Sequence, residues 1–455
     1  MVDGLVNDTR KPCENKLYVA VAGPNFDGHE FINAAQSKGA CGALVETEID
    51  ADIPAVKVVD SVKAMGQIAS AWRADFDIPV LGITGSAGKT TLKEMAGSIL
   101  SITRRGVITE GNLNNDLGVP LTLTRLSSDD EFAVIEMGKN HAGEIRYLSN
   151  MAAPNIAIIN NAAPAHLDDL GSVEAVAYAK AEIIEGLADD GVLVINADDQ
   201  YCDLWQSLVA GQRVVMFGLN ETADIYASFN ASAMGSDIHV NGVYGQFTVN
   251  INLPVEHNVR NALAVIAATL EMGCSIEDVQ KGLSSHESIS NRGGLHAFEQ
   301  LMLIDDSYNA NPVSMSAALN VLALQADELR ARNTLVKVFV VLGDMAELGE
   351  NAQELHQQVG MQANDVANVL YCYGKFARHY YSGFFQGKFS DDMPSFVSFD
   401  SMLVALLDDI EKSISTDNLY PLILVKGSRS ASMEKAISAI INAQTHDKNN
   451  KLESQ

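Results

Sequence analysis

A glycine-rich turn between an apolar segment and a helical segment carries the clearest chemical signal in the chain. Residues 80–95 read Val-Leu-Gly-Ile-Thr-Gly-Ser-Ala-Gly-Lys-Thr-Thr-Leu-Lys-Glu-Met. Gly85 and Gly88 let backbone N–H groups approach phosphate oxygens. Lys89 brings a positive charge to the β and γ phosphates, and Thr90 offers a hydroxyl to Mg²⁺ at a helix N-terminus. The segment therefore predicts a site for a nucleoside triphosphate.

This motif is the short form Gly-x-x-Gly-Lys-Thr of the phosphate-binding loop. Ile83 stands where the longer pattern has its first glycine. An ordinary strand-to-helix turn is the alternative interpretation, but the apolar strand before the loop and the helix after it favour nucleotide binding.

The composition indicates a globular protein with several cores. The chain has 455 residues, a length that corresponds to about three domains of about 150 residues. Its hydrophobic content of 47% is sufficient to form several apolar cores. No apolar run approaches the ~18 residues of a membrane span, and the N-terminus lacks the pattern of a signal peptide. The five cysteines are scattered without a Cys-x-x-Cys pair, so neither disulfides nor zinc are expected. We therefore expect a cytoplasmic protein.

Acidic residues outnumber basic ones, 58 against 31, and the formal net charge is −27. Binding along a nucleic-acid backbone requires a basic surface, so we do not expect a nucleic-acid partner. An anionic substrate would have to be met by lysines and arginines gathered locally around it.

Three segments of alternating apolar runs and helical patterns follow one another. Residues 1–76 predict a small α/β unit, and 77–290 predict a doubly wound parallel sheet. A second alternation over 291–442 predicts a Rossmann-like domain, and 443–455 form a polar tail that we expect to be disordered. Runs that predict strands lie at 17–21, 43–45, 55–59, 132–135, 156–159, 192–195, 301–304, 338–342, 369–371 and 422–425; helices are predicted near 31–38 and 258–272.

Polar side chains follow the apolar runs of the central segment, where open α/β sheets bind their ligands. Glu136 ends one run and can supply a carboxylate to Mg²⁺ beside Thr90; a solvated strand end is the alternative. His166 follows the next run, and Lys180 lies in a helical stretch further on. In isolation, such a His and Lys are more often structural.

Several short motifs occur in a fixed order along the chain. They are Thr84-Gly-Ser-Ala-Gly-Lys-Thr-Thr91, Gly111-Asn-Leu-Asn-Asn115, Glu136-Met-Gly138, Ala165-His-Leu167, Ala179-Lys180, His257-Asn258, Asn261-Ala262, Asp305-Asp-Ser-Tyr-Asn-Ala-Asn-Pro312, Leu342-Gly-Asp-Met345 and Lys426-Gly-Ser-Arg429. In this order the motifs resemble those of the Mur ligases over almost the whole chain. The 305–312 run resembles the member that adds a dipeptide, and the Asp-Asn-Pro-Arg run of the sibling that adds a third amino acid is absent.

This resemblance implies an α/β fold of three domains: a UDP-binding N-terminal domain, a P-loop ATPase-like domain with a parallel sheet, and a Rossmann-like C-terminal domain. It implies an ATP-dependent ligase that joins D-alanyl-D-alanine to UDP-N-acetylmuramoyl-tripeptide in cytoplasmic peptidoglycan synthesis. The tripeptide carboxylate would first become an acyl phosphate, and the dipeptide amine would then displace phosphate, with ADP also released. We expect a monomer.

The resemblance also implies site residues. Nucleotide contacts fall on Thr84, Gly85, Ser86, Ala87, Gly88, Lys89, Thr90, Thr91, Asn258, Asn261, Arg292 and Asp306. The catalytic residues implied are Lys89, Glu136, His166 and Lys180, and the groups expected to hold two Mg²⁺ ions are Thr90, Glu136, His166 and Lys180. Substrate contacts fall on Asp8, Thr9, Arg10, Asp27, Gly28, His29, Asn309, Asn311, Lys426, Ser428 and Arg429.

Lys180 stands where several Mur ligases carry a carbamate, which would turn the cation into an anionic metal ligand. Only the neutral amine reacts with CO₂, and a free lysine is almost wholly protonated at pH 7. Burial or a nearby metal must therefore lower its pKa before carbamylation becomes substantial. An unmodified Lys180 acting as a counter-charge is the alternative.

The match to the family is less complete at a few places. Thr9 stands where Ser is usual, Val255 stands where Gly is usual, and family members have a strand and a helix before Asp8. The Asp27-Gly28-His29 run would by itself predict only a tight turn. These departures leave a second hypothesis, a nucleotide-binding Mur-ligase-like protein with weakened or lost ligase activity.

Overall fold

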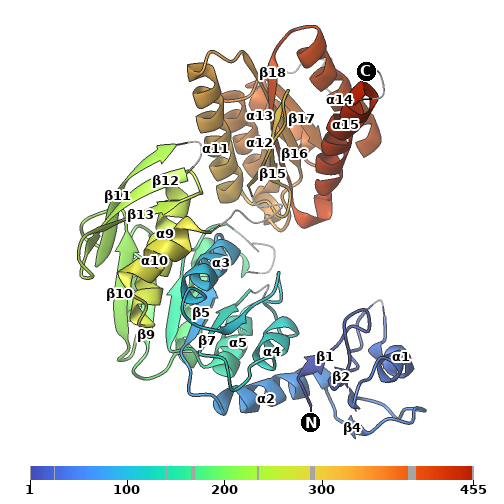
Figure 1. The fold of residues 1–455 in the computed structure, drawn as a ribbon, viewed down its shortest axis with the longest axis vertical. Coiled ribbons are helices and arrows are strands. Elements are labelled where there is room, and N and C mark those ends of the chain that lie inside the picture. The colour runs from blue at the N-terminus through green and yellow to red at the C-terminus, as the bar shows by residue number, and fades with distance from the viewer. Residues whose placement is uncertain are drawn as a thin grey trace.

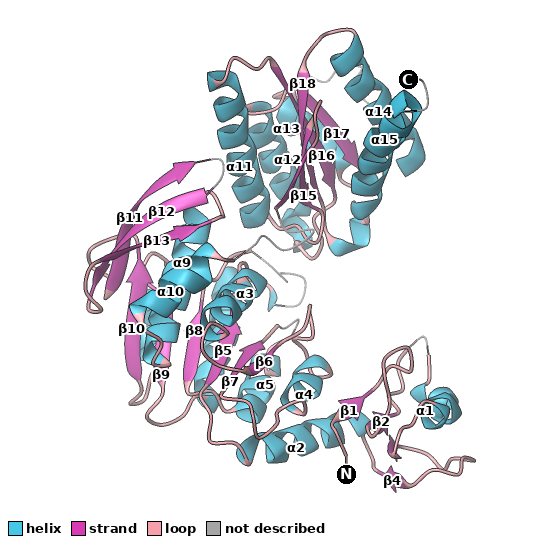
Figure 2. Cartoon of the chain, viewed as in Figure 1, coloured by secondary structure: helices cyan, strands magenta, loops and turns pink. Residues whose placement is uncertain are grey.

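The computed structural model describes residues 2–24, 26–138, 141–164, 170–232, 235–286, 293–387 and 396–452. Within these residues the strands form three sheets, one from each successive part of the chain (Figure 1). The nine-stranded central sheet lies between the N-terminal part and the C-terminal part (Figure 1). Helices flank the sheets, as Figure 2 shows. The predicted α/β fold with three domains is confirmed, whereas the domain boundaries drawn from the sequence remain predictions.

The N-terminal sheet is small and parallel, with the order β1-β2-β3-β4 among the described strands. Its strands are β1 (Leu5–Val6), β2 (Leu17–Val19), β3 (Gly42–Val45) and β4 (Ala55–Lys57). A 3₁₀ turn, η1 (Gly28–Phe31), leads into α1 (Ile32–Ser37). Tyr18, Ile32 and Ala43 are among the buried residues of this core. The three runs predicted as strands here are confirmed, and β1, only two residues long, was not predicted.

Helix α2 (Ser61–Ala74) attaches the small sheet to the central domain (Figure 1). Its N-cap, Asp60, accepts a hydrogen bond from the Lys63 N–H. At its other end, the buried Arg73 guanidinium donates to Ala152 O (3.1 Å), Ala153 O (3.3 Å) and Phe76 O (2.6 Å). Two of these carbonyls end helix α5 (Glu144–Ala152), where helix carbonyls have no partner within the helix. Arg73 therefore joins the first two domains.

We expect Arg73→Met to destabilise the protein by about 3 kcal/mol, because the buried carbonyl of Ala152 and the partly buried carbonyl of Phe76 lose a charged donor. Chemical unfolding can be followed by the fluorescence of Trp72, whose Nε1–H donates to Leu126 O across the same interface (3.0 Å). Arg330→Met, which removes an exposed pair with Asp327, should change the midpoint little. Equal midpoints for the two variants would contradict the role given to Arg73.

The central sheet has the order β13-β12-β11-β10-β9-β8-β5-β7-β6 among the described strands. The strands from β6 to β11 are parallel, and β12 and β13 continue the sheet antiparallel. The inner strands are nearly continuous apolar runs because helices bury them on both faces. The strands are β5 (Val80–Thr84), β6 (Gly106–Ile108), β7 (Phe132–Glu136), β8 (Ile156–Ile159), β9 (Val192–Asn196), β10 (Arg213–Gly218), β11 (Ile225–Ser232), β12 (Gly235–Gly242) and β13 (Phe247–Ile251).

Two separate apolar cores cover the two faces of this sheet. One face packs against α3 (Lys89–Leu100), α9 (Glu256–Glu271) and α10 (Ile276–Ser284). The other packs against α4 (Gly118–Leu123), α5, α7 (Val173–Ala181) and α8 (Cys202–Ser207). A 3₁₀ segment, η2 (Glu182–Gly186), follows α7 directly. The phosphate-binding loop and α9 thus belong to the same layer.

The C-terminal sheet has the order β14-β15-β18-β16-β17 in the described chain, and only β14 runs antiparallel to its neighbour. The strands are β14 (Gly294–Ala297), β15 (Met302–Asp306), β16 (Val336–Gly343), β17 (Val369–Tyr373) and β18 (Tyr420–Lys426). One face packs against α11 (Pro312–Ala331), α12 (Ala352–Asn364) and α13 (Ala377–Phe384). The other packs against α14 (Phe399–Ser415) and α15 (Glu434–Leu452). Two 3₁₀ turns, η3 (Gly349–Asn351) and η4 (Arg429–Ala431), precede α12 and α15.

The expectation of disorder from residue 443 onward was wrong as far as residue 452, because α15 continues through this segment. The first turns of α15 are anchored by the buried Ala436, Ile437 and Ile440. The helix continues from this apolar start into the polar segment, although Thr, His, Asp and Asn are weak helix formers.

No helix in the described ranges is both long and apolar enough to cross a membrane.

Candidate active site

The phosphate-binding loop joins strand β5 to helix α3. Gly88 is the N-cap of α3 and has a φ of 82°, in the left-handed region that favours glycine. A Cβ atom there would lie 2.6 Å from Asn160 Nδ2 and 2.7 Å from Asn261 Oδ1. Backbone conformation and crowding both require glycine at this position.

We expect Gly88→Ala to lower the affinity for Mg²⁺–ADP at least about tenfold, because a left-handed alanine costs about 1–2 kcal/mol before any clash is relieved. Isothermal titration calorimetry would measure this. Gly143→Ala is the matched control: Gly143 is also a left-handed N-cap, with a φ of 86°, but its Cβ would meet nothing within 4 Å. An equal loss of affinity in both variants would contradict the packing argument.

Two asparagines at the carboxyl end of β8 hold the loop in shape. Asn161 Oδ1 accepts from the Ala87 N–H (2.9 Å), and Asn160 Nδ2 donates to Ala87 O (3.0 Å). Asn160 Nδ2 also donates to Asn261 Oδ1 on α9 (2.9 Å). The loop is therefore tied both to the neighbouring strand and to the helix that carries Asn258 and Asn261.

Lys89 begins α3, and its Nζ donates to Gly85 O (2.6 Å). The N–H groups in the first turn of a helix have no acceptor within the helix, and the helix dipole adds positive potential there. An ammonium beside such a turn is suited to binding an anionic phosphate chain.

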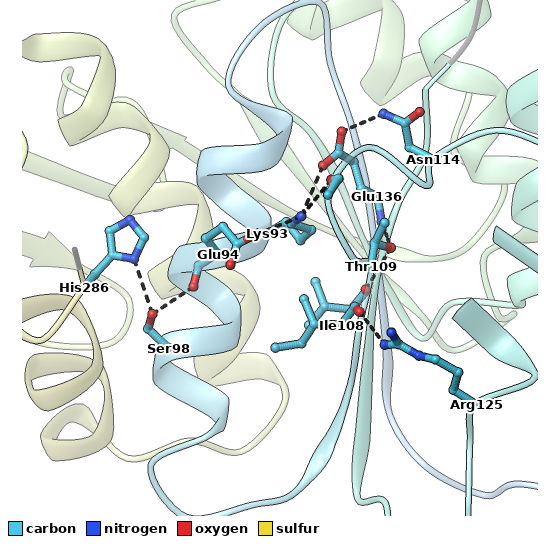
Figure 3. A network of polar contacts seen from close by, with 11 residues as sticks. Lys93, Glu94, Ser98, Ile108, Thr109, Asn114, Arg125, Glu136 and His286 are labelled. Carbon is cyan, nitrogen blue, oxygen red and sulfur yellow. Dashed lines mark hydrogen bonds and ion pairs between the residues drawn. The ribbon is translucent and has the colours of Figure 1, made fainter. Parts of the chain in front are cut away.

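Glu136 ends β7 and is 1% exposed. Its Oε1 accepts from Asn114 Nδ2 (2.7 Å), whereas its buried Oε2 has no hydrogen-bond partner among the described residues (Figure 3). The nearest described ammonium, Lys93 Nζ, is 4.0 Å from Oε2, which is too far for a hydrogen bond, so the lone pairs of this buried oxygen stay available to a metal ion. Glu136 lines the same cavity as Thr90, so a carboxylate and a hydroxyl face one space. This donor set fits Mg²⁺, which commonly takes one or two protein oxygens and completes its shell with phosphate and water.

A cavity of about 410 Å³ collects residues from the central and C-terminal domains. It is lined by many of the predicted nucleotide, metal and substrate residues: Ser86, Ala87, Gly88, Lys89, Thr90, Thr91, Glu136, Asn258, Asn261, Asp306, Asn309, Asn311 and Lys426. Thr84 and Gly85 lie just before these residues, and Thr84 Oγ1 donates to Met137 O (3.1 Å).

The C-terminal wall of the cavity is organised by Lys426, which is 2% exposed at the end of β18. Its Nζ donates to Asp306 Oδ2 (2.6 Å) and to Asn309 O (2.8 Å). Asp306 and Lys426 are paired in register on the adjacent parallel strands β15 and β18. Asn311 caps α11 by accepting from the Ser314 N–H (2.8 Å). The predicted substrate residues of this run are thus fixed by one buried ammonium and one helix cap.

The predicted substrate residues near the N-terminus lie in the small-sheet domain and do not line this cavity. The Arg10 side chain donates to both carboxylate oxygens of Asp8 (2.9 and 2.8 Å), and these bonds lower the pKa of Asp8 to about 2. The neighbouring Thr9 O accepts from Lys38 Nζ (2.6 Å).

The Asp27-Gly28-His29 run is a tight turn. The Asp27 carboxylate accepts from the His29 N–H (2.9 Å), and Tyr18 OH donates to Gly28 O (2.9 Å). His29 Nε2 accepts from the Glu46 N–H (2.9 Å), so the ring proton sits on Nδ1, which lies 2.6 Å from Asp27 Oδ1. This turn holds the imidazole in one tautomer and one orientation.

Five other predicted site residues either do not line the cavity or lie outside the described residues. His166 and Arg292 lie outside the described residues. Lys180 is 1% exposed in the last turn of α7 and does not line the cavity. Ser428 is buried and Arg429 is exposed in the segment after β18; neither lines the cavity.

Several cavity residues were not predicted as site residues. Asn160 and Asn161 directly follow the apolar run 156–159. Ligand-binding residues of parallel sheets are expected at this position, so the sequence alone could have indicated them. Arg260 lies one turn after Glu256 and pairs with Asp198 (2.9 Å), and nothing in the local sequence indicates that contact.

The fold and the cavity together define a nucleotide-binding α/β protein whose site is shared by two domains.

Comparison with known proteins gives the family. Residues 83–269 match the Mur ligase middle domain, and residues 293–447 match the Mur ligase glutamate ligase domain. UDP-N-acetylmuramoyl-tripeptide–D-alanyl-D-alanine ligase of Escherichia coli (strain K12) is 36% identical over 444 residues, covering 96% of this chain and 94% of that protein. The ligase of the same name from Bacillus subtilis (strain 168) is 32% identical, with coverages of 97% and 94%.

Solved structures give the same result. A crystal structure of MurF from Acinetobacter baumannii has a TM-score of 0.87 and 32% identity, covering 97% of this chain and 94% of that one. MurF ligase from Thermotoga maritima in complex with ADP has a TM-score of 0.81 and 25% identity, with coverages of 98% and 99%. The chain belongs to the Mur ligase family, and the resemblance inferred from its motifs is confirmed.

Proposed function

We propose that the chain is an ATP-dependent, ADP-forming ligase that joins D-alanyl-D-alanine to UDP-N-acetylmuramoyl-tripeptide. The observation that carries the proposal is the single cavity in which the phosphate-binding loop and Glu136 face the 306–311 run and Lys426. The names of the full-length relatives support the same reaction. The reaction belongs to peptidoglycan precursor synthesis, and we place it in the cytoplasm with a monomeric enzyme.

The chemistry has two steps. A carboxylate oxygen of the tripeptide forms a bond to the γ-phosphorus of ATP while the bond to ADP breaks, which gives an acyl phosphate. The amine of D-alanyl-D-alanine then attacks the carbonyl carbon, loses a proton, and phosphate leaves as the peptide bond forms. Positioning and charge stabilisation dominate such transfers.

The residues of the chain divide this work. Lys89 and the first turn of α3 neutralise the β and γ phosphates. Thr90 and Glu136 would hold one Mg²⁺, which would supply neutralisation of the phosphate charge. Asn258 or Asn261 faces the adenine, and Arg292 and Asp306 contact the nucleotide from the C-terminal domain.

The remaining substrate residues hold the two substrates that are joined. Asp8, Thr9, Arg10 and the 27–29 turn bind the UDP end in the N-terminal domain, and Asn309, Asn311, Lys426, Ser428 and Arg429 bind the peptide substrates.

His166 and Lys180 would hold a second Mg²⁺, with the side chain of Lys180 modified to a carbamate. Lys180 is 1% exposed in the last turn of α7, so its amine lies inside the protein rather than in solvent. Intact-protein mass spectrometry at neutral and acidic pH distinguishes the carbamate, whose extra CO₂ is lost in acid, from an unmodified counter-charge.

The test is ADP release by the purified protein with Mg²⁺–ATP, UDP-N-acetylmuramoyl-tripeptide and D-alanyl-D-alanine, with each acceptor omitted in turn. We expect release only when both are present, together with a product heavier by the condensed dipeptide. Nucleotide binding without condensation would favour the alternative of a Mur-ligase-like protein that has lost activity.

A further inference from the structure

Lys93 is a fully buried lysine one helical turn after Lys89 on α3 (Figure 3). Its Nζ donates to Gly111 O (3.0 Å) and pairs with Glu94 Oε1 (2.9 Å). Lysine is almost never fully buried unless it is paired, because removing an ammonium from water is costly. Further groups around Lys93 must therefore stabilise its buried ammonium.

The Lys93 ammonium also lies beside the carboxylate of Glu136. Its Nζ is 4.0 Å from Glu136 Oε2, the oxygen that has no hydrogen-bond partner among the described residues. This distance is too long for a hydrogen bond but short enough for strong attraction in a buried site. Lys93 thus balances the charge of Glu136 without occupying the lone pairs of Oε2.

Lys93 also anchors the segment that holds the other carboxylate oxygen. Gly111, which it binds, lies three residues before Asn114, whose Nδ2 donates to Glu136 Oε1 (2.7 Å). Asn114 O accepts from the Gly138 N–H (2.8 Å), which ties this segment to the residues after β7. One ammonium therefore fixes Glu136 directly by attraction and indirectly through Asn114.

We propose that Lys93 is a positioning residue for the metal site, which holds Glu136 and Asn114 so that Glu136 Oε2 faces the incoming Mg²⁺. The inference rests on the proposed function in one respect, the assignment of Glu136 as a metal ligand. Groups in the outer shell of a metal site typically contribute 10- to 100-fold to metal affinity or activity. A purely structural Lys93 would affect stability but not the metal.

The test measures Mn²⁺ binding to the protein with ADP by electron paramagnetic resonance, the Mg²⁺ dependence of turnover, and thermal stability. For Lys93→Met we expect the Mn²⁺ Kd and the Mg²⁺ concentration for half-maximal turnover to rise about tenfold. Glu94→Gln is the control, because it removes a charge that contacts Lys93 but not Glu136, and both metal constants should stay within about twofold. Lys93→Met with a lower melting temperature and unchanged metal constants would overturn the proposal.

Glu136→Gln separates this inference from the assignment on which it rests. If Glu136→Gln leaves Mn²⁺ binding unchanged, the assignment of Glu136 fails; if it weakens binding and Lys93→Met does not, only the role of Lys93 fails. When Glu136 is already Gln, Lys93→Met should cause no further loss of Mn²⁺ affinity. If it still weakened Mn²⁺ binding about tenfold, Lys93 would not act through Glu136. Should Lys93→Met not fold, Lys93→Gln keeps a donor for Gly111 O and is judged by the same criteria.

Discussion

We expect Lys89→Ala to lower turnover by at least about 10³-fold while the protein stays folded. Its ammonium stands at the start of α3, where it would meet charge that develops on the transferred phosphoryl group, and losses of this size follow removal of such a group. Alanine is the best helix former, so α3 should be unaffected. Phosphate release in the presence of both acceptors measures the loss, and circular dichroism checks the fold.

Lys281→Ala is the control for Lys89→Ala. Lys281 lies on α10 in the same domain and makes an exposed pair with Glu277, so its loss should leave turnover unchanged. Near-normal turnover in folded Lys89→Ala would contradict the prediction that residues 85–91 bind the phosphates.

The second large effect is expected for Lys426→Met, which we expect to lower turnover about 100-fold and stability by about 3 kcal/mol. Removing one member of a largely buried ion pair is strongly destabilising, and here Asp306 on the cavity wall loses the ammonium of Lys426. Asn309 also loses the donor to its carbonyl, so the 306–311 run should lose its shape. Turnover at saturating substrates and chemical unfolding measure the two effects.

Lys337→Met distinguishes loss of function from loss of stability. Lys337 lies on β16 of the same sheet and pairs with Asp409 at 2.8 Å, but it does not line the cavity. We expect it to reduce stability with turnover retained. If Lys426→Met and Lys337→Met lost turnover equally, the loss in Lys426→Met would be caused by reduced stability and not by damage to the site.

The central and C-terminal sheets could be predicted because their inner strands are continuous apolar runs. The runs 132–135, 156–159, 338–342 and 422–425 all lie within buried strands. Strand β6 has only three residues at the edge of its sheet, and its formation depends on pairing with β7 rather than on a local pattern. Such short edge strands leave little signal in the sequence.

The candidate site was predicted unevenly for a similar reason. Lys89, Thr90 and Glu136 sit beside local patterns, a glycine loop and a strand end, that indicate their chemistry. Lys93 could not be recognised in this way, because its partners Gly111 and Glu136 lie 18 and 43 residues away in sequence. A lysine on an amphipathic helix is normally a solvated residue, and only the fold shows that this one is buried.

The contacts of Arg73 have a consequence for substrate choice. They fasten the N-terminal sheet to the carbonyl end of α5, so the distance from the 27–29 turn to the phosphate-binding loop is set by the protein. If the UDP end of the acceptor is held at one place and its peptide carboxylate reacts at the other, this distance acts as a ruler. Peptides that are too short or too long would be rejected by reach, without any need for the enzyme to recognise each residue between the two ends.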